Sequence, residues 1–272
     1  MDTLGRRARG DRRSHEVTTS LSFERHLAAL EQSGGALSGF ADAAGLDRAV
    51  PTCPDWTVAQ LVAHQAMVHR WATEHISGGD PDTAPSDDQI LATSSDLLAF
   101  YHEGLVALLA ALKAARPDLD TFTFLKDAPA PREFRARRQA HETTMHAVDA
   151  QAAALGRPPT AVETGLDPSF AVDGLDELLR GFFTRGKSKV FDGSPIVVVV
   201  APSDADRRWL VRIDERLTVD DGDPDTPDAD ARLTGTAAAL YLALWNRGDE
   251  IEVDGDQRFL ARWHETQRVT WS

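Results

Sequence analysis

The sequence predicts a two-domain α+β protein, with an N-terminal four-helix bundle and a smaller C-terminal α+β domain. The chain has 272 residues, of which 42% are hydrophobic, so it can bury two cores of ordinary size. Apolar residues recur at helical spacing in the first half, whereas β-branched and alternating segments appear after about residue 160. We therefore expect a disordered basic tail over residues 1–19, a helical bundle over 20–160 and an α+β domain over 170–272.

Charge and cysteine content exclude several classes of protein. The net charge of -14 argues against a general nucleic-acid or anionic-membrane binder, and no apolar run approaches the ~20 residues that span a bilayer. Cys53 is the only cysteine, which excludes internal disulfides and fits a reducing cytoplasm. The basic tail lacks the hydrophobic segment of a secretory signal, and a nucleic-acid- or partner-binding arm is the alternative to disorder.

Four helices of the N-terminal half follow from apolar periodicity, over residues 21–46, 57–75, 86–115 and 131–155. Gly34 and Gly35 fall in the middle of the first helix, where they predict a kink or a break. Thr57 and Gln60 match a capping box at the start of the second helix. Gly156 is placed to end the fourth helix, and helices of this length form a bundle.

The C-terminal half mixes strands and helices. Residues 195–200 form a β-branched run typical of a buried strand, and the segments that follow alternate between apolar and polar residues. We expect strands over residues 195–200, 209–213 and 217–219, and helices over 175–184, 236–246 and 259–263. This order is that of a small α+β domain.

One histidine lies in an apolar row of the second helix. Leu61, His64 and Val68 are spaced by three and four residues, so His64 faces the interior of the bundle. A single histidine in such a row is most often a hydrogen-bonded core residue. His69 and His75 lie off this row, and we expect them at the surface.

The fourth helix changes this interpretation because four ionisable residues share one of its faces. They are separated by four, four and three residues: Arg138, Glu142, His146 and Asp149. Other polar residues can form the solvated side of the helix: Arg135, Arg137, Gln139 and Gln151. Ionisable groups buried without mutual pairing or a metal cost several kcal/mol each, so the shared face needs one or the other.

A metal site is one solution. Glu142 and His146 lie side by side on the helix, and His64 from a neighbouring helix completes a set of three ligands. Two imidazoles and one carboxylate leave an open coordination position, as in catalytic zinc sites. We expect Asp149 to orient the imidazole of His146. A buried ion network without metal is the alternative.

Two further residues, His141 and Cys53, are not expected to bind the metal. His141 and His146 resemble part of a zinc-protease motif, but five residues separate them by about 140° around a helix, so they cannot share an ion. Cys53 precedes a helix N-terminus, where a thiolate nucleophile is conceivable. Packing as a small apolar residue is favoured, because no base lies near it in the sequence.

Two segments resemble the hallmarks of the mycothiol-dependent maleylpyruvate isomerase family, namely Val50–His64 and Arg137–Ala150. The stretch Leu233–Arg247 is similar to the family's smaller C-terminal domain. The resemblance implies a DinB-like four-helix bundle, a sterol-carrier-like C-terminal domain and Zn²⁺ bound by a His, a Glu and a second His. These ligands fall on His64, Glu142 and His146.

The resemblance also implies an activity. The expected cosubstrate is the low-molecular-weight thiol mycothiol, which adds to a small electrophile in cis-trans isomerisation or thiol transfer. Arg247 matches a family arginine that holds anionic groups, although Asn246 replaces the usual glycine before it. A cation at a helix C-terminus is the equal alternative for Arg247. For Arg138 we favour pairing with Glu142 or Asp149 over anion binding.

We expect this enzyme to act on small molecules in the cytoplasm as a monomer or weak oligomer, without nucleic-acid or membrane partners. The principal alternative is a non-catalytic, metal-containing protein that binds a small molecule or serves in regulation. That alternative predicts a metal closed off by four protein ligands.

Overall fold

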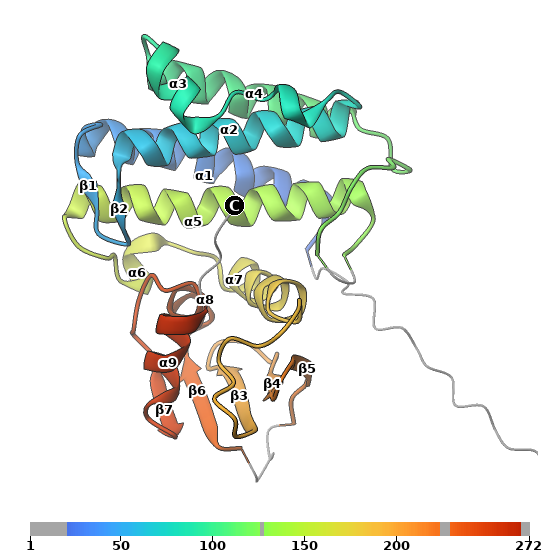
Figure 1. Ribbon diagram of the computed structural model, residues 1–272, viewed down its shortest axis with the longest axis vertical. Helices are drawn as coiled ribbons and strands as arrows, with labels where there is room; N and C mark the ends of the chain where they lie inside the picture. Colours follow the sequence, from blue (N-terminus) through green and yellow to red (C-terminus); the bar gives the residue numbers. More distant parts are fainter. Residues whose placement is uncertain (1–20, 126–127, 224–228, 268–272) are drawn as a thin grey trace, which may run out of the picture.

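The computed structural model describes residues 21–125, 128–223 and 229–267. It has an N-terminal layer of helices and a C-terminal half that contains a sheet, which confirms the two-domain α+β class (Figure 1). The predicted basic tail over residues 1–19 lies outside the described residues.

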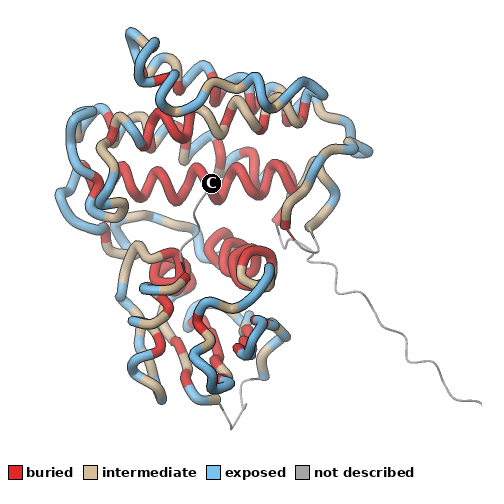
Figure 2. The backbone as a smooth tube through the Cα atoms, in the orientation of Figure 1, coloured by how far each residue is buried: buried red, intermediate tan, exposed pale blue. Residues whose placement is uncertain are grey.

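Four long helices form the bundle, α1 Phe23–Ala44, α2 Val58–Ser77, α4 Leu97–Ala114 and α5 Pro131–Leu155. Helix α5 lies between the other bundle helices and the C-terminal half (Figure 1). Every residue from Phe134 to Ala153 is buried, as the continuous red of α5 in Figure 2 shows. The expected solvated side of this helix was therefore wrong. Arg135, Arg137, Gln139 and Gln151 are all buried: Arg137 meets Asp173 of the C-terminal half, whereas Arg135 lies over Trp71 and donates to the backbone oxygen of Phe122.

Two expectations about helix breaks were wrong. Helix α1 runs without interruption through Gly34 and Gly35. The helix expected over residues 86–115 is two helices, the short α3 Asp87–Thr93 and α4. Asp96 marks the start of α4, since its side chain accepts a hydrogen bond of 3.0 Å from the backbone N–H of Ala99 and caps the helix.

The segment before α2 is a small hairpin rather than a plain loop. Strand β1 covers Ala49–Val50 and pairs antiparallel with β2, Cys53–Thr57. The capping box is confirmed, because Thr57 accepts from the backbone of Gln60 while the Gln60 side chain accepts from the backbone of Thr57. The hairpin and the cap hold β2 against the first turn of α2.

The C-terminal half contains a five-stranded sheet of order β5-β4-β3-β6-β7. Its strands are β3 Ile196–Pro202, β4 Trp209–Ile213, β5 Leu217–Asp221, β6 Ala231–Gly235 and β7 Glu252–Gly255. Strand β3 pairs antiparallel with β4 and parallel with β6. The first three strands were predicted. Strands β6 and β7 were not, because neither contains an apolar run.

Helices of the C-terminal half lie between the sheet and the bundle (Figure 1). They are α7 Pro168–Asp176, which continues as the π-helical segment η2 Glu177–Phe182, and α8 Ala237–Leu244. Two smaller elements are α6 Ala161–Thr164 and, near the C-terminus, α9 Phe259–Thr266. The short turn η1 Pro81–Thr83 precedes α3. One hydrophobic cluster includes Leu30 and Phe134 of the bundle together with Leu175 and Trp209, so the two halves share a core.

Helix α4 departs from the expectation that no apolar run could cross a membrane. Among the described residues it is the one helix whose length and composition would allow this, with 18 residues and a mean hydropathy of 1.5. The observation is weak evidence for a membrane span, since core helices of bundles pass the same test. In this structure Leu105, Leu108 and Leu112 of α4 are buried in the core shared with α1 and α5.

Candidate metal centre

The structure brings His64 of α2 together with Glu142 and His146 of α5. The Nε2 atom of His146 lies 3.3 Å from Oε1 of Glu142, and Nε2 of His64 lies 3.9 Å from the same oxygen. All three residues are buried, and their potential ligand atoms lie within 4.8 Å of one another. The ring centroids of the two histidines are 5.3 Å apart and nearly perpendicular, so both imidazoles present Nε2 to one point.

The outer atoms of these three side chains are each held by a neighbour. Nδ1 of His146 lies 3.0 Å from Oδ2 of Asp149, as the sequence predicted. Nδ1 of His64 lies 3.1 Å from Oδ2 of Asp87. Arg138 donates to Oε2 of Glu142 at 2.6 Å. Partners of this kind fix the tautomer and direction of metal-binding groups, so the inward-facing atoms are left free to bind an ion.

The donor set fits a divalent cation. Among the described residues, the buried Nε2 atom of His64 has no hydrogen-bond partner, although it points at Glu142. An unsatisfied buried nitrogen beside a carboxylate and a second imidazole is what a site for a divalent ion would contain. Two nitrogens and one oxygen suit zinc among other divalent metals.

Electrostatics keep the carboxylate charged. Burial alone would raise the pKa of Glu142, but the charge of Arg138 and the adjacent imidazoles of His146 and His64 hold it well below the usual value. Burial alone would lower the pKa of His64, but the hydrogen bond to Asp87 and the nearby carboxylate of Glu142 outweigh burial and raise it to about 9. Without a metal ion, the protonated imidazole of His64 therefore supplies part of the positive charge that an ion would place beside the Glu142 carboxylate.

Arg138 pairs as we favoured, although its second partner was not foreseen. Its guanidinium forms ion pairs with Glu142 of its own helix and with Glu177 at the start of η2. Burial alone would lower the pKa of Arg138, but these two carboxylates raise it above the usual value. The arginine thus connects the candidate metal site to the C-terminal half.

Arg247 reaches the same site from the segment after α8. It donates to both carboxylate oxygens of Asp149, at 3.1 and 2.9 Å. The preceding Asn246 has a φ of 62°, a left-handed conformation that asparagine tolerates better than most residues, so it can replace the glycine at this turn. Arg247 therefore does more than interact with a helix dipole, because it neutralises the residue that orients His146.

Cys53 lies beside this ion pair. Its sulfur is 3.5 Å from Oδ2 of Asp149 and 3.5 Å from a nitrogen of Arg247. Burial and, to a lesser extent, the charge of Asp149 raise the pKa of Cys53 to about 12. At neutral pH the side chain is a thiol, which supports the packing interpretation over a nucleophile.

Sequence reasoning missed two residues of the site. Asp87 lies in the first turn of α3, and nothing in its local pattern connects it to His64. Trp56 of β2 packs on both histidines, with ring centroids 4.9 Å from His64 and 5.9 Å from His146. The signal that could have identified Trp56 is its position directly before the capping box, where an apolar residue packs onto the helix.

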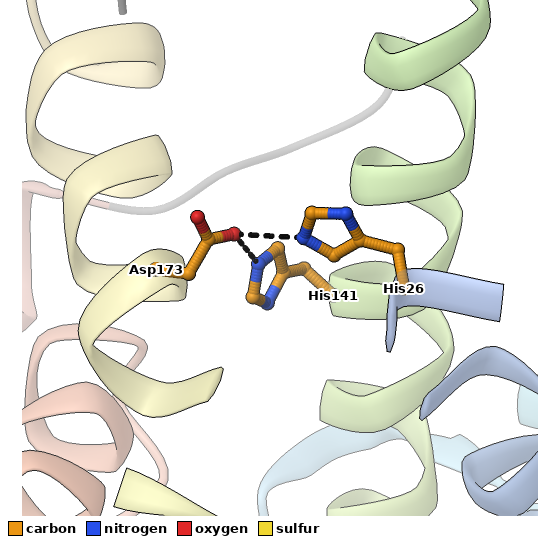
Figure 3. A group of neighbouring side chains, drawn as sticks. All are labelled: His26, His141 and Asp173. Atoms are coloured by element: carbon orange, nitrogen blue, oxygen red, sulfur yellow. Dashed lines mark hydrogen bonds and ion pairs between the residues drawn. The ribbon is translucent and has the colours of Figure 1, made fainter. Parts of the chain in front are cut away.

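A second group of buried side chains has the composition of a metal site but a different set of contacts. Oδ2 of Asp173 lies 3.0 Å from Nε2 of His26 and 2.9 Å from Nε2 of His141 (Figure 3). Arg137 donates to the same oxygen at 2.8 Å, and Tyr241 lies 2.9 Å from Nδ1 of His141. Arg137 lies where an ion would have to bind, so these side chains form a hydrogen-bond network rather than a metal site. The network also keeps His141 apart from Glu142 and His146.

The other two histidines of α2 differ from expectation. His69, expected at the surface, is fully buried and lies 2.9 Å from the hydroxyl of Thr143. Burial lowers its pKa to about 3, so the ring is neutral. His75 is half-buried against Trp71. The error arises because α5 packs more broadly against α2 than one row of apolar residues suggested.

Two cavities meet at the candidate metal site. The larger has a volume of about 820 Å³ and the smaller about 550 Å³. Both are lined by His64 and Glu142, whereas His146 and Arg247 line only the smaller one. The site therefore has two approaches, which would allow two small molecules to reach one metal ion.

Comparisons with known proteins agree with this architecture. The family model described as the mycothiol maleylpyruvate isomerase N-terminal domain matches residues 26–151, and the one for the C-terminal domain of that family matches residues 169–262. No curated protein matches the chain.

A crystal structure of a mycothiol-dependent maleylpyruvate isomerase is similar over 92% of this chain and 98% of its own, with a TM-score of 0.63 and 15% identity. A histidine-to-alanine mutant of such an isomerase is similar over the same shares, with a TM-score of 0.62 and 14% identity. With both domain models matched in order, the chain belongs to the mycothiol-dependent maleylpyruvate isomerase family.

Proposed function

We propose that this protein is a metal-dependent, mycothiol-using enzyme that acts on a small electrophile in the cytoplasm. The observation that carries the proposal is the set of His64, Glu142 and His146 at the junction of two cavities. A site with three protein ligands and free space beside it is typical of catalytic rather than structural metal centres. Family membership supports the thiol, because the matched domain models bear its name.

Each residue near the site has a proposed task. His64, Glu142 and His146 would hold Zn²⁺ or another divalent ion, and such an ion would supply a Lewis acid that favours the thiolate and polarises a carbonyl. Asp87 and Asp149 hold the imidazoles in the required tautomer. These contacts keep the inner nitrogens available as ligands.

Two arginines complete the charge balance. Arg138 and Arg247 neutralise Glu142 and Asp149 respectively, so neither carboxylate has to take up a proton. Arg247 also lines the smaller cavity, where we propose that it attracts an anionic group of the thiol or of the substrate.

The proposed reaction is addition of the mycothiol sulfur to an electrophilic carbon of the substrate. A carbon–sulfur bond forms as the carbon–carbon π bond of the substrate opens, its electron pair passes to the adjacent carbonyl as an enolate, and the thiol proton goes to solvent or to that enolate. If the bond breaks again after rotation, the result is cis-trans isomerisation. If it persists, the result is thiol transfer. The family name favours isomerisation.

The test is thiol dependence of turnover. Zinc-loaded protein is incubated with mycothiol and a panel of electrophiles that includes maleylpyruvate, and product is followed with and without the thiol. We expect turnover only with thiol present, and a loss of about 100-fold or more in Glu142→Gln, where a charged metal ligand becomes neutral. Lys113→Gln, a charge change on the exposed side of α4, serves as the control and should leave turnover unchanged.

Metal analysis separates the alternatives. If zinc is bound one to one but no electrophile is turned over with thiol, the catalytic proposal is wrong. A metal with no exchangeable coordination position would then favour the non-catalytic binding protein. Purified protein without stoichiometric metal, even after loading, would favour the buried ion network.

A further inference from the structure

The larger cavity has an apolar wall that the proposed chemistry does not require. Aromatic side chains from α2, from the loop before α5 and from η2 line it, together with one methionine: Met67, Trp71, Phe122, Phe124, Phe182 and Phe183. Its volume of about 820 Å³ lies near the upper end of the range for small-molecule sites. Phe122 is 59% exposed, although it packs beside Phe124 at a centroid distance of 6.4 Å. Phe122 therefore extends the apolar wall to the mouth of the cavity, where a ligand could pack against it.

The rim of this cavity is basic. Arg185, Lys187 and Lys189 follow η2, and all three line the cavity and are exposed. Within the described ranges, none of them forms an ion pair, and Arg185 lies over the ring of Phe124 at 5.8 Å, even though the whole chain carries a net charge of -14. Three cations without a carboxylate partner, beside an apolar wall, attract a ligand that has an anionic group at one end.

The smaller cavity has a different character. It is lined by polar groups on several sides, among them Asp55, Asp87, Asn246 and Arg247. A hydroxyl-rich molecule would find hydrogen-bond partners there, and Trp56, Leu244 and Trp245 supply apolar surface beside them. The two cavities meet at His64 and Glu142, so ligands in each would come together at the candidate metal site.

We infer that the larger cavity binds the electrophile, and that this electrophile combines an aromatic or extended alkyl body with one acid group. The apolar body packs against Trp71 and Phe124, and the acid group lies at Lys187 and Lys189. The polar thiol approaches through the smaller cavity. This inference rests on the proposed function and specifies its substrate class, which is larger and more apolar than a short dicarboxylic acid.

Binding of unreactive probes tests the substrate class without chemistry. Isothermal titration of zinc-loaded protein compares 4-phenylbutyrate with 4-phenyl-1-butanol and with maleate. We expect 4-phenylbutyrate to bind at least about tenfold more tightly than either, because only it satisfies both the apolar wall and the basic rim. Its affinity should fall as salt is raised, and that of the alcohol should not.

Variants of the rim and the wall separate the two contributions. Lys187→Gln together with Lys189→Gln should weaken 4-phenylbutyrate about three- to tenfold and leave 4-phenyl-1-butanol unchanged. Phe122→Ala should weaken both probes about fivefold, since it removes apolar contact area. Both changes lie at exposed positions, so folding is retained, and Lys113→Gln on α4 controls for the loss of one positive charge.

The outcomes distinguish this inference from the proposed function. If maleate binds more tightly than 4-phenylbutyrate, or if the double lysine variant binds 4-phenylbutyrate normally, the inference is overturned. Either result leaves thiol-dependent turnover of a small dicarboxylate intact. Absence of turnover with any electrophile, together with the expected binding pattern, would overturn the proposed function and uphold the ligand class of the cavity.

Discussion

At the scale of single residues, His64 couples the candidate metal site to pH. Without metal, its pKa is raised to about 9 by Asp87 and Glu142 despite the opposing effect of burial. A metal ion binds the neutral imidazole, so it has to displace this proton at any pH below 9. Zinc affinity should therefore fall about tenfold for each pH unit below 9, as measured by competition with a zinc-chelating dye.

Asp87→Asn tests the origin of this pH dependence. Removal of the carboxylate charge lowers the pKa of His64, so the fall in affinity should begin at a lower pH. The limiting affinity at high pH should be about 10–100-fold weaker, because the imidazole is no longer held in place. His102→Gln changes an exposed histidine of α4 and should behave as wild type. A zinc affinity that is constant between pH 9 and pH 6 would show that zinc binding displaces no proton from His64 in this range.

The three candidate ligands could be predicted from the sequence, but their supporting residues could only partly be predicted. Glu142, His146 and Asp149 lie on one helix, so spacing alone places them together. Asp87 and Trp56 come from other elements, and their approach depends on how α3 and the hairpin pack against α2. Such contacts have no signature in local spacing.

At the scale of secondary-structure elements, the two glycines of α1 show how packing overrides local propensity. A Cβ atom on Gly34 would lie 2.4 Å from a methyl carbon of Leu105 on α4, whereas a Cβ on Gly35 would meet nothing within 4 Å. Gly34 thus allows α1 and α4 to approach closely, and the predicted break does not occur, since α1 is continuous over Phe23–Ala44.

The pair provides a matched test. Gly34→Ala should lower the free energy of unfolding by about 1–3 kcal/mol through overpacking against Leu105. Gly35→Ala should raise it by about 0.5–1 kcal/mol, because alanine favours the helix and has room. Urea unfolding followed by circular dichroism measures both. Equal effects of the two substitutions would contradict the close approach of α1 and α4.

Element boundaries show the same limit of sequence reasoning. Apolar spacing located α2, α5 and strand β3 to within a few residues. It did not indicate that α5 is buried on every side, because the second covering layer comes from a part of the chain that is distant in sequence. Of the polar residues that we assigned to solvent, Arg137 instead meets Asp173 of α7, and Gln151 donates to the backbone oxygen of Glu163 in α6.

At the scale of the whole molecule, these polar contacts join the bundle to the C-terminal half. His26 of α1 meets Asp173 of α7 (Figure 3), Arg137 of α5 meets the same carboxylate, and Arg138 meets Glu177. Burial alone would raise the pKa of Asp173, but hydrogen bonds from His141 and His26 and the charge of Arg137 hold it below the usual value. Because Arg247 reaches the metal site from the C-terminal half, this junction also positions part of that site.

Asp173→Asn tests the junction. It leaves Arg137 without its nearest buried counter-charge and should cost about 3 kcal/mol of unfolding free energy at neutral pH. A carboxylate with a depressed pKa contributes stability above its unfolded pKa of about 3.9, and that stability is lost as the pH falls through the folded value. The difference between wild type and variant should therefore narrow below about pH 4. Asp118→Asn, at an exposed pair with Arg116, should leave the urea midpoint unchanged. A loss in Asp173→Asn no larger than that of the control would mean that the junction depends on apolar packing alone.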